Sequence, residues 1–197
     1  MNYKFYSKYT FLLLSISLLV GCMTTKQGAD AYFKSGDIKS KQGNYKGAIR
    51  DFGRAIKVNP QHAKAYLGRS SVKYNLKNYT GAIEDCSAAI RLNPKLTDAY
   101  FNLGISYYEL KKYKQAIAEF DRSIVQKPQD AEAYYIRGKA KMHTGDTLGA
   151  CNDWALAAKM SYIRAANMQK KYCANTDNKQ KMTEESPAQV REIRDNE

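Results

Sequence analysis

The chain has 197 residues, which suits one medium-sized domain or a short array of repeats and excludes a large multidomain enzyme. Hydrophobic residues make up 44% and charged residues 26%, so we expect a folded core and exclude both wholesale disorder and a protein with many membrane spans. The net charge of +13 comes with only two histidines, which leaves little material for a histidine-based active site, so we expect no enzyme activity, no cofactor and no metal.

The first 22 residues have the pattern of a secretory signal. Lys4 and Lys8 form a positively charged start without acidic residues, and residues 11–20 form an apolar stretch too short to span a bilayer as a helix. This stretch ends in Leu-Val-Gly-Cys at residues 19–22, which resembles the lipobox of bacterial lipoproteins. The resemblance implies a signal peptide over residues 1–21 and lipidation of Cys22 by diacylglycerol and acyl chains such as palmitate. The alternative is an ordinary secretory signal with an incidental cysteine.

The lipobox resemblance also implies a location. Acyl chains on Cys22 would anchor the protein in a membrane while the folded part stays in water. Met23 after the cysteine, in place of aspartate, favours the outer membrane of a bacterium with two membranes, with the protein facing the periplasm. Residues 22–28 would then be a short polar tether that keeps the folded part near the lipid surface. Nucleic acid is not an expected partner of an exported protein.

A 34-residue period organises the next part of the chain. Pro60, Pro94 and Pro128 are separated by 34 residues each, and such a fixed period is typical of repeat proteins. If the copies begin at residues 29, 63, 97 and 131, a tyrosine stands at the fourth position and an alanine at the twentieth position of every copy. The tyrosines are Tyr32, Tyr66, Tyr100 and Tyr134, and the alanines are Ala48, Ala82, Ala116 and Ala150.

The third copy carries the clearest motif. Its residues are Tyr100, Leu103, Gly104 and Tyr107 in the spacing Y-x2-L-G-x2-Y, followed by Ala116, Phe120 and Pro128. This pattern resembles the tetratricopeptide repeat (TPR), with tyrosine in place of the usual tryptophan. The resemblance implies an all-α fold, an α-solenoid of four helix hairpins over residues 29–62, 63–96, 97–130 and 131–164.

The periodicity within each copy also favours two helices. Residues 99–110 and 113–124 are apolar-periodic stretches that are joined by a short turn and closed by Lys-Pro. Small residues recur where the two helices would cross, at Gly36, Ser70, Gly104 and Gly138. Larger residues recur where the space between helices would be filled, at Phe52, Cys86, Phe120 and Trp154. Because one hairpin cannot bury its own apolar face, we expect the copies to stack on one another.

The fourth copy ends differently from the others. Tyr162 stands where the earlier copies have proline, and Ala165, Met168 and Tyr172 follow at helical spacing. We therefore expect a capping helix over residues 165–174 that covers the exposed edge of the last repeat. Residues 175–197 contain almost no large apolar side chains, and we expect a disordered tail there.

Three cysteines remain when Cys22 is set aside. Cys86 stands at a position held elsewhere by phenylalanine, so we expect a small buried side chain. The arrangement of Cys151, Trp154 and Cys173 resembles the closing segment of other secreted bacterial TPR proteins. Two alternatives follow for Cys151 and Cys173, a disulfide that staples the capping helix or two free thiols.

The TPR resemblance further implies a concave groove lined by the first helices of the repeats. Carried over position by position, the expected groove residues are Phe33, Asp37, Leu67, Ser71, Tyr74, Phe101, Ile105, Tyr108, Tyr135, Lys139 and Met142. Their aromatic and apolar character suits an extended peptide or a helix of a partner protein, and no small-molecule substrate is expected. The alternative is that these aromatics only pack. A clamp for terminal carboxylates, known in some TPR proteins, is not expected, because only Asn102 of the corresponding residues fits.

The remaining charges allow a second hypothesis. We expect a lipid-anchored adaptor that binds partner proteins at the periplasmic face of the outer membrane, and the alternative is a basic surface that binds polyanionic glycan or lipid headgroups. The lysines and arginines could also form no more than a solvated face. The acids Glu84, Asp85 and Glu119 on second helices are expected to be solvated as well.

Overall fold

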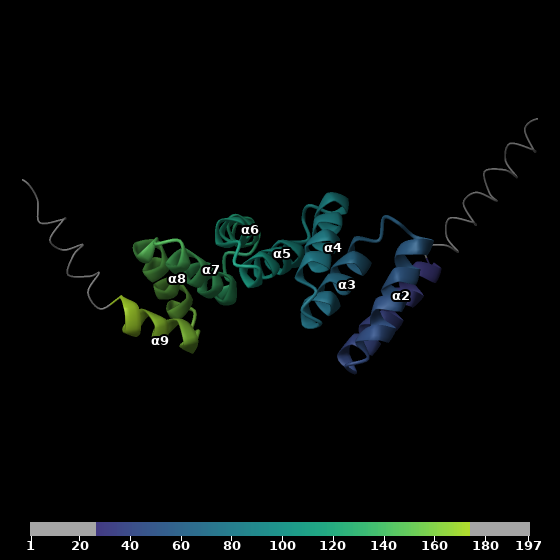
Figure 1. Cartoon of the computed structure of the whole chain (residues 1–197), viewed down its shortest axis with the longest axis horizontal. Helices are drawn as coiled ribbons and strands as arrows, with labels where there is room; N and C mark the ends of the chain where they lie inside the picture. The colour runs from purple at the N-terminus through teal and green to yellow at the C-terminus, as the bar shows by residue number, and fades with distance from the viewer. Residues whose placement is uncertain (1–26, 174–197) are drawn as a thin grey trace, which may run out of the picture. The chain divides into compact units, whose positions relative to one another are not determined.

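The computed structural model describes residues 27–173, and this range is helical apart from short turns. Helical residues first run from 27 to 41. The helices that follow are α2 (Tyr45–Val58), α3 (Ala63–Asn75), α4 (Tyr79–Leu92), α5 (Thr97–Glu109), α6 (Tyr113–Gln126), α7 (Ala131–His143), α8 (Thr147–Lys159) and α9 (Ile163–Tyr172) (Figure 1). The described range contains no strand. The expected all-α class, helix hairpins followed by one further helix, is confirmed.

Several expectations concern residues beyond this range. The signal peptide over residues 1–21, Cys22 and most of the tether lie outside the described residues, as does the tail over residues 175–197. Residues 27 and 28, expected in the tether, are already helical, and α9 begins two residues before the expected capping helix. Between residues 27 and 173, no helix is long and apolar enough to cross a bilayer.

The turn inside each hairpin has a recurring geometry. One residue of the turn has a positive φ angle: 75° at Gly43, 60° at Lys77, 60° at Lys111 and 87° at Gly145. The next residue caps the second helix, and the side chains of Asn44, Asn78 and Asp146 accept hydrogen bonds from the backbone N–H groups of Gly47, Gly81 and Gly149. These caps satisfy backbone donors that have no partner inside the helix. In the third hairpin the capping position is Lys112, which makes no such bond.

The chain forms two compact units, Met1–Ser106 and Tyr107–Glu197, and the boundary falls inside α5. We call them the N-terminal unit and the C-terminal unit. The core of the N-terminal unit is built around Phe52, which is 1% exposed and packs with Ala48 and Val72. Two glycines allow its ring to fit, since a Cβ atom at Gly36 or Gly68 would lie 2.8 or 2.7 Å from ring atoms of Phe52. The predicted small residue at position 36 is therefore explained by a close contact.

The C-terminal unit is built in the same way around Trp154. This side chain is fully buried, and a Cβ atom at Gly138 would lie 2.6 Å from its Nε1 atom. A disulfide joins Cys151 of α8 to Cys173, which is the residue directly after the end of α9. This connection holds α9 against α8, and the two helices lie side by side in Figure 1. Cys86, in the other unit, is buried and free, as expected.

A buried aspartate recurs in the second helices, and it corrects one expectation. Asp51, Asp85 and Asp153 are 1%, 3% and 2% exposed, and each is paired with a lysine of the preceding helix: Lys39, Lys73 and Lys141. Arg69 and Arg137 add two hydrogen bonds each to Asp85 and Asp153. The expectation that Asp85 is solvated is wrong, because it is the acceptor that joins the two helices of its hairpin.

These pairs shift the pKa values of the groups involved. The hydrogen bond from Lys39 holds the pKa of the Asp51 carboxyl below its usual value, against the opposite effect of burial. The hydrogen bond to Asp85 raises the pKa of Arg69. The third repeat has Glu119 at the equivalent position and lacks the two basic residues, which are replaced by Leu103 and Tyr107. Burial raises the pKa of Glu119, although Arg122 at 3.3 Å acts in the opposite direction.

Candidate functional site

The expected groove residues share one property in the structure. All of them lie on the first helix of a hairpin, and each is partly exposed, neither buried in a core nor fully in solvent. Phe33, Asp37, Leu67, Ser71, Tyr74, Phe101 and Ile105 belong to the N-terminal unit, and Tyr108, Tyr135, Lys139 and Met142 belong to the C-terminal unit. The two sets are therefore two surfaces, one on each unit.

In the N-terminal unit, Phe33 is partly committed to packing. Its ring lies 5.8 Å from the Phe52 ring and 5.1 Å from the His62 ring, measured between centroids. His62 also caps α3, because its Nδ1 atom accepts from the backbone N–H of Ala65, and its Nε2 atom lies 3.0 Å from Asp30. Phe33 thus combines both interpretations offered by the sequence, a packing residue with one side still exposed.

Polar residues of this unit are mostly satisfied internally. Ser71 accepts a hydrogen bond of 2.9 Å from the Asn102 amide, which ties α3 to α5, and donates to the carbonyl of Leu67. Asp37 is paired with Lys41 at 2.7 Å on the same helix. On α3, the Tyr74 ring lies 5.5 Å from that of Tyr79 at the start of α4. A partner would therefore meet aromatic rings beside polar side chains that already have partners within the unit.

The C-terminal unit has a denser cluster of aromatic rings around Lys139. The Lys139 ammonium lies 4.9 Å from the centroid of the Tyr108 ring and 5.8 Å from that of Tyr135, within the range of cation–π attraction. Tyr135 packs against Tyr162 with a centroid distance of 5.2 Å, and Trp154 donates a hydrogen bond of 3.1 Å to the Tyr135 carbonyl. The aromatic surface is therefore anchored to the core of the unit.

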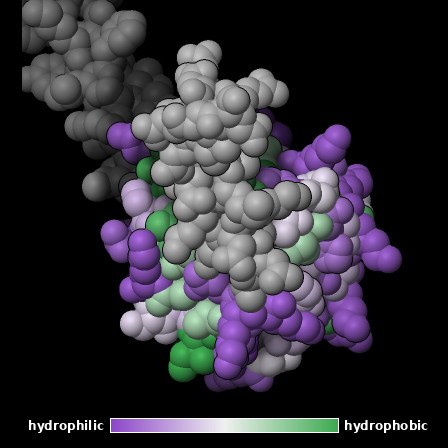
Figure 2. Space-filling model, turned by 90° about the vertical axis from the view of Figure 1, so that its left-hand side faces the viewer, coloured by the Kyte–Doolittle hydropathy of each residue, from purple (hydrophilic) through white to green (hydrophobic). Residues whose placement is uncertain are grey.

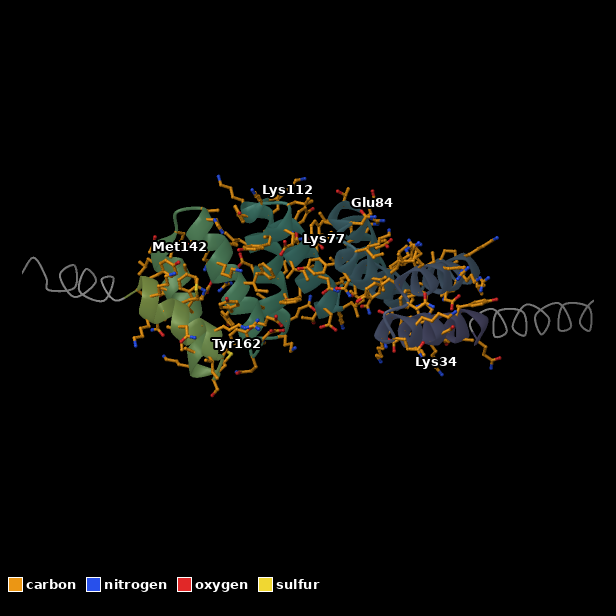
Figure 3. All side chains as sticks on the ribbon, turned by 60° about the horizontal axis from the view of Figure 1, so that its bottom comes forward. Lys34, Lys77, Glu84, Lys112, Met142 and Tyr162 are labelled. Carbon is orange, nitrogen blue, oxygen red and sulfur yellow. A yellow bond between two sulfur atoms is a disulfide. The ribbon has the colours of Figure 1, made fainter. Side chains whose placement is uncertain are left out.

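Met142 stands at the edge of this cluster, one turn after Lys139 on α7. It packs against the core that contains Trp154, and its sulfur atom accepts a hydrogen bond of 3.9 Å from the Thr147 hydroxyl. Met142 and Tyr162 are labelled in Figure 3, both in the C-terminal unit. A flexible thioether beside rigid rings is suited to adapting to different partner side chains.

An open hollow of about 420 Å³ lies beside this aromatic cluster. It is lined by Lys111, Lys112, Tyr113, Lys114, Gln115, His143 and Thr144, which come from the start of α6 with the turn before it and from the end of α7. His143 stacks on Tyr113 with the ring centroids 4.3 Å apart and the planes 7° from parallel, and it lies 6.1 Å from Tyr108. The hollow and the aromatic cluster are therefore parts of one surface of the C-terminal unit.

Two family models match this chain, and both describe the tetratricopeptide repeat. One matches residues 29–97 and the other residues 73–140, so together they cover more than half of the 197 residues. The chain is a tetratricopeptide-repeat protein. No match is found among curated protein sequences.

Solved TPR structures resemble this TPR protein over most of their length. The crystal structure of MamA is 25% identical with a TM-score of 0.65, and the similarity covers 70% of this chain and 81% of MamA. The first TPR of Spaghetti (RPAP3) bound to the HSP90 peptide SRMEEVD is 27% identical with a TM-score of 0.60, over 61% of this chain and 95% of that one. The Arabidopsis OM64 TPR domain is 25% identical with a TM-score of 0.59, covering 60% and 98%. The fold is that of a protein-interaction scaffold, and proteins of this kind are typically not catalytic.

Sequence reasoning missed several residues of the TPR surface. Tyr113 and Tyr162 contact the predicted residues, and the lysines of the hollow are, by sequence alone, only part of a general basic face. A signal for Tyr113 was present, because Tyr45 and Tyr79 stand at the same repeat position. No such signal exists for Tyr162, whose contact depends on the path of α9.

The described part of the TPR protein gives no sign of a metal centre. Between residues 27 and 173, no group of three or more His, Cys, Asp or Glu residues is placed to hold a metal ion. The buried acids Asp51, Asp85 and Asp153 are all paired with basic side chains within their own hairpins. These carboxylates therefore serve the packing of the hairpins.

Proposed function

We propose that this protein is a lipid-anchored adaptor that binds segments of partner proteins through the partly exposed aromatic residues of its first helices, at the periplasmic face of the outer membrane. The observation that carries the binding role is the shared exposure of all eleven predicted groove residues. Side chains that served packing alone would be buried, whereas Tyr108, Tyr135 and Lys139 present a rigid aromatic surface to solvent. Rigid aromatic anchors contribute much of the energy of protein interfaces.

The related structures support a peptide as the form of the ligand. The RPAP3 domain is bound to an HSP90 peptide, which shows that a TPR domain similar to part of this chain can hold a peptide. That ligand itself is not carried over, because Phe33, Asp37, Gly68 and Asp98 stand at positions where the carboxylate clamp needs other residues. We propose a protein segment of different sequence.

The lipid anchor rests on the N-terminal sequence alone. Lys4, Lys8, the apolar residues 11–20 and the lipobox ending at Cys22 support it. The test is metabolic labelling with an alkyne palmitate in cells that express the full chain, followed by separation of inner and outer membranes. Wild type should carry the label and fractionate with the outer membrane, and Cys22→Ala should lose the label. A labelled Cys22→Ala protein, or an unlabelled wild type, would reject lipidation at this residue.

The binding role is tested by crosslinking in intact cell envelopes. A variant with Phe33, Phe101 and Tyr135 changed to alanine is compared with wild type after its helix content is verified by circular dichroism. We expect a specific partner to be captured by wild type and lost by the variant. The matched control changes Val125, Leu156 and Ile163 to alanine, because these apolar side chains are exposed and belong to α6, α8 and α9 and not to a first helix. The control should keep the partner.

Two outcomes would contradict the groove as the binding surface. One is a partner that both alanine variants retain. The other is capture of only glycan or lipid that is released between low and physiological ionic strength, which is the behaviour of the alternative, a polyanion-binding basic face.

The surface at the end that carries α8 and α9 is largely hydrophilic around small, separate hydrophobic groups (Figure 2), so that end offers no broad apolar patch outside the grey atoms.

A further inference from the structure

We infer that the C-terminal unit recognises an acidic segment of a partner protein, with Lys139 and the lysine-lined hollow as the positions that bind its carboxylates. This inference deepens the proposed function and rests on it, because it uses the same first-helix surface. It adds the chemistry of the partner and names the side chains that select it.

Lys139 is the first observation. Its side chain is partly buried, its ammonium lies between the Tyr108 and Tyr135 rings, and it forms no ion pair with any residue in the range 27–173. The basic residues Arg137 and Lys141, two positions to either side on α7, are both paired with Asp153. Lys139 is therefore a positioned cation on α7 whose charge is left for a ligand, and the two rings restrict where its ammonium can lie.

The hollow is the second observation. Its lining contains three lysines, Lys111, Lys112 and Lys114, and no carboxylate. None of the three forms an ion pair with another described residue. Lys112 is labelled in Figure 3 and lies at the outer edge of the C-terminal unit, at the turn before α6. The hollow has a volume of about 420 Å³, which is enough for one or two acidic side chains.

The two positions are connected by aromatic rings. Tyr108 contacts the Lys139 ammonium on one side and lies 5.5 Å from Tyr113 and 6.1 Å from His143 on the other. Tyr113 and His143 form one wall of the hollow. An extended segment could therefore pack its apolar atoms on these rings while its carboxylates reach lysines at both ends.

Two acidic residues lie on the helices that form this surface. Glu109 follows Tyr108 at the end of α5, and Glu132 lies in the first turn of α7, about 10 Å along the helix from Lys139 by the helical rise. Neither lines the hollow. In the N-terminal unit the acids nearest Phe33 have partners of their own, since Asp37 is paired with Lys41 and Asp30 lies 3.0 Å from His62. The acidic selectivity is assigned to the C-terminal unit, where the Lys139 ammonium lies against the rings of Tyr108 and Tyr135.

Charge complementarity of this kind contributes mainly to selectivity, which makes selection the suitable experiment. A random-peptide phage library is panned at physiological ionic strength on the purified full chain in detergent. The targets are wild type, Lys139→Met, Lys139→Glu and the matched control Lys159→Met, whose lysine is exposed on α8. We expect wild type and Lys159→Met to select peptides rich in aspartate, glutamate and aromatic residues. Lys139→Met should lose the acidic enrichment, and Lys139→Glu should select lysine and arginine.

The hollow is tested with one synthetic peptide from the wild-type selection. Its affinity is measured by fluorescence anisotropy for wild type and for a variant with Lys111, Lys112 and Lys114 changed to glutamine. We expect a loss of affinity of about tenfold or more, since several charge contacts are removed together. Circular dichroism of each variant establishes that the helices are retained.

The possible failures are distinguishable. If wild type selects no peptide at all, the proposed peptide-binding function fails together with this inference. If wild type selects peptides whose acidic content is unchanged in Lys139→Met, the peptide-binding function stands and this inference is overturned. Binding that has no sequence preference and disappears between low and physiological salt would also overturn it, in favour of general polyanion binding.

Discussion

The indole N–H of Trp154 donates a hydrogen bond of 3.1 Å to the backbone carbonyl of Tyr135. This contact joins the largest fully buried side chain of the C-terminal unit to a residue of its aromatic surface. The orientation of Tyr135 toward Lys139 and Tyr162 therefore depends on how the core is packed.

Trp154→Phe should destabilise the C-terminal unit. The change removes the hydrogen bond to Tyr135 and leaves empty space next to Gly138, so we expect a loss of about 2 kcal/mol and a melting temperature lower by several degrees. The measurement is thermal unfolding followed by circular dichroism. Tyr172→Phe is the control, because Tyr172 is exposed and should tolerate the change. Equal melting temperatures for Trp154→Phe and wild type would show that the indole is not required.

Two glycines of the N-terminal unit should respond in opposite directions to alanine. At Gly68 a Cβ atom would lie 2.7 Å from the buried ring of Phe52, so Gly68→Ala should cost about 1 to 3 kcal/mol of stability. At Gly53, inside α2, the nearest atom is Arg69 Nη1 at 3.9 Å, so Gly53→Ala should stabilise by about 0.5 to 1 kcal/mol through helix propensity. Urea unfolding of both variants measures this, and changes of the same sign would contradict the packing described here.

Glu119→Gln should stabilise the protein at neutral pH. The pKa of Glu119 is raised above 4.5 because burial disfavours its charge. The folded state therefore holds this proton more tightly than the unfolded state, and stability falls as the pH rises through the folded pKa. Glutamine cannot ionise, so the variant should be more stable than wild type at pH 7 and lose that advantage near pH 4.

The melting temperatures of wild type and Glu119→Gln are compared at pH 7 and pH 4. Glu84→Gln is the control. Glu84 is an exposed acid on α4 and should show no such pH-dependent gain. If Glu119→Gln gains stability equally at both pH values, the effect does not come from ionisation.

The Cys151–Cys173 disulfide should stabilise the attachment of α9. It closes a loop with a sequence separation of 22, and the chain-entropy model gives a contribution of about 3 kcal/mol for a loop of this size. A variant with both cysteines changed to alanine should unfold at a lower temperature and show faster hydrogen exchange in α9. Unchanged exchange in α9 would mean that packing alone holds the helix.

Alkylation provides a direct check of the cysteine assignment. In the native protein without reductant, neither Cys151 nor Cys173 should react with iodoacetamide, and Cys86 should also be protected. Burial raises the pKa of the Cys86 thiol to about 11 and keeps the reagent away. After reduction, Cys151 and Cys173 should react while Cys86 stays protected. Modification of Cys151 before reduction would contradict the bridge.

Much of this protein follows from its sequence by itself. The 34-residue period of proline, tyrosine and alanine predicts that the chain forms helix hairpins and where each repeat begins, because each position in a repeat meets the same neighbours in every copy. For the same reason the positions of the groove residues on the first helices could be assigned from the repeat register. Lipidation at Cys22 and the location stay predictions from sequence, since they concern residues outside the described range.

Only the tertiary structure decided which charges are used internally and which are left for a partner. By sequence alone, Asp85 and Lys139 are both charged residues on helices of a repeat array, with nothing to show which of them is used internally. In the structure Asp85 is buried against Arg69 and Lys73. Lys139 instead lies between two tyrosine rings and is in no ion pair with a described residue. The contact of Tyr162 with Tyr135 likewise depends on where α9 packs. Such pairings are made between residues far apart in the chain, and local periodicity carries no information about them.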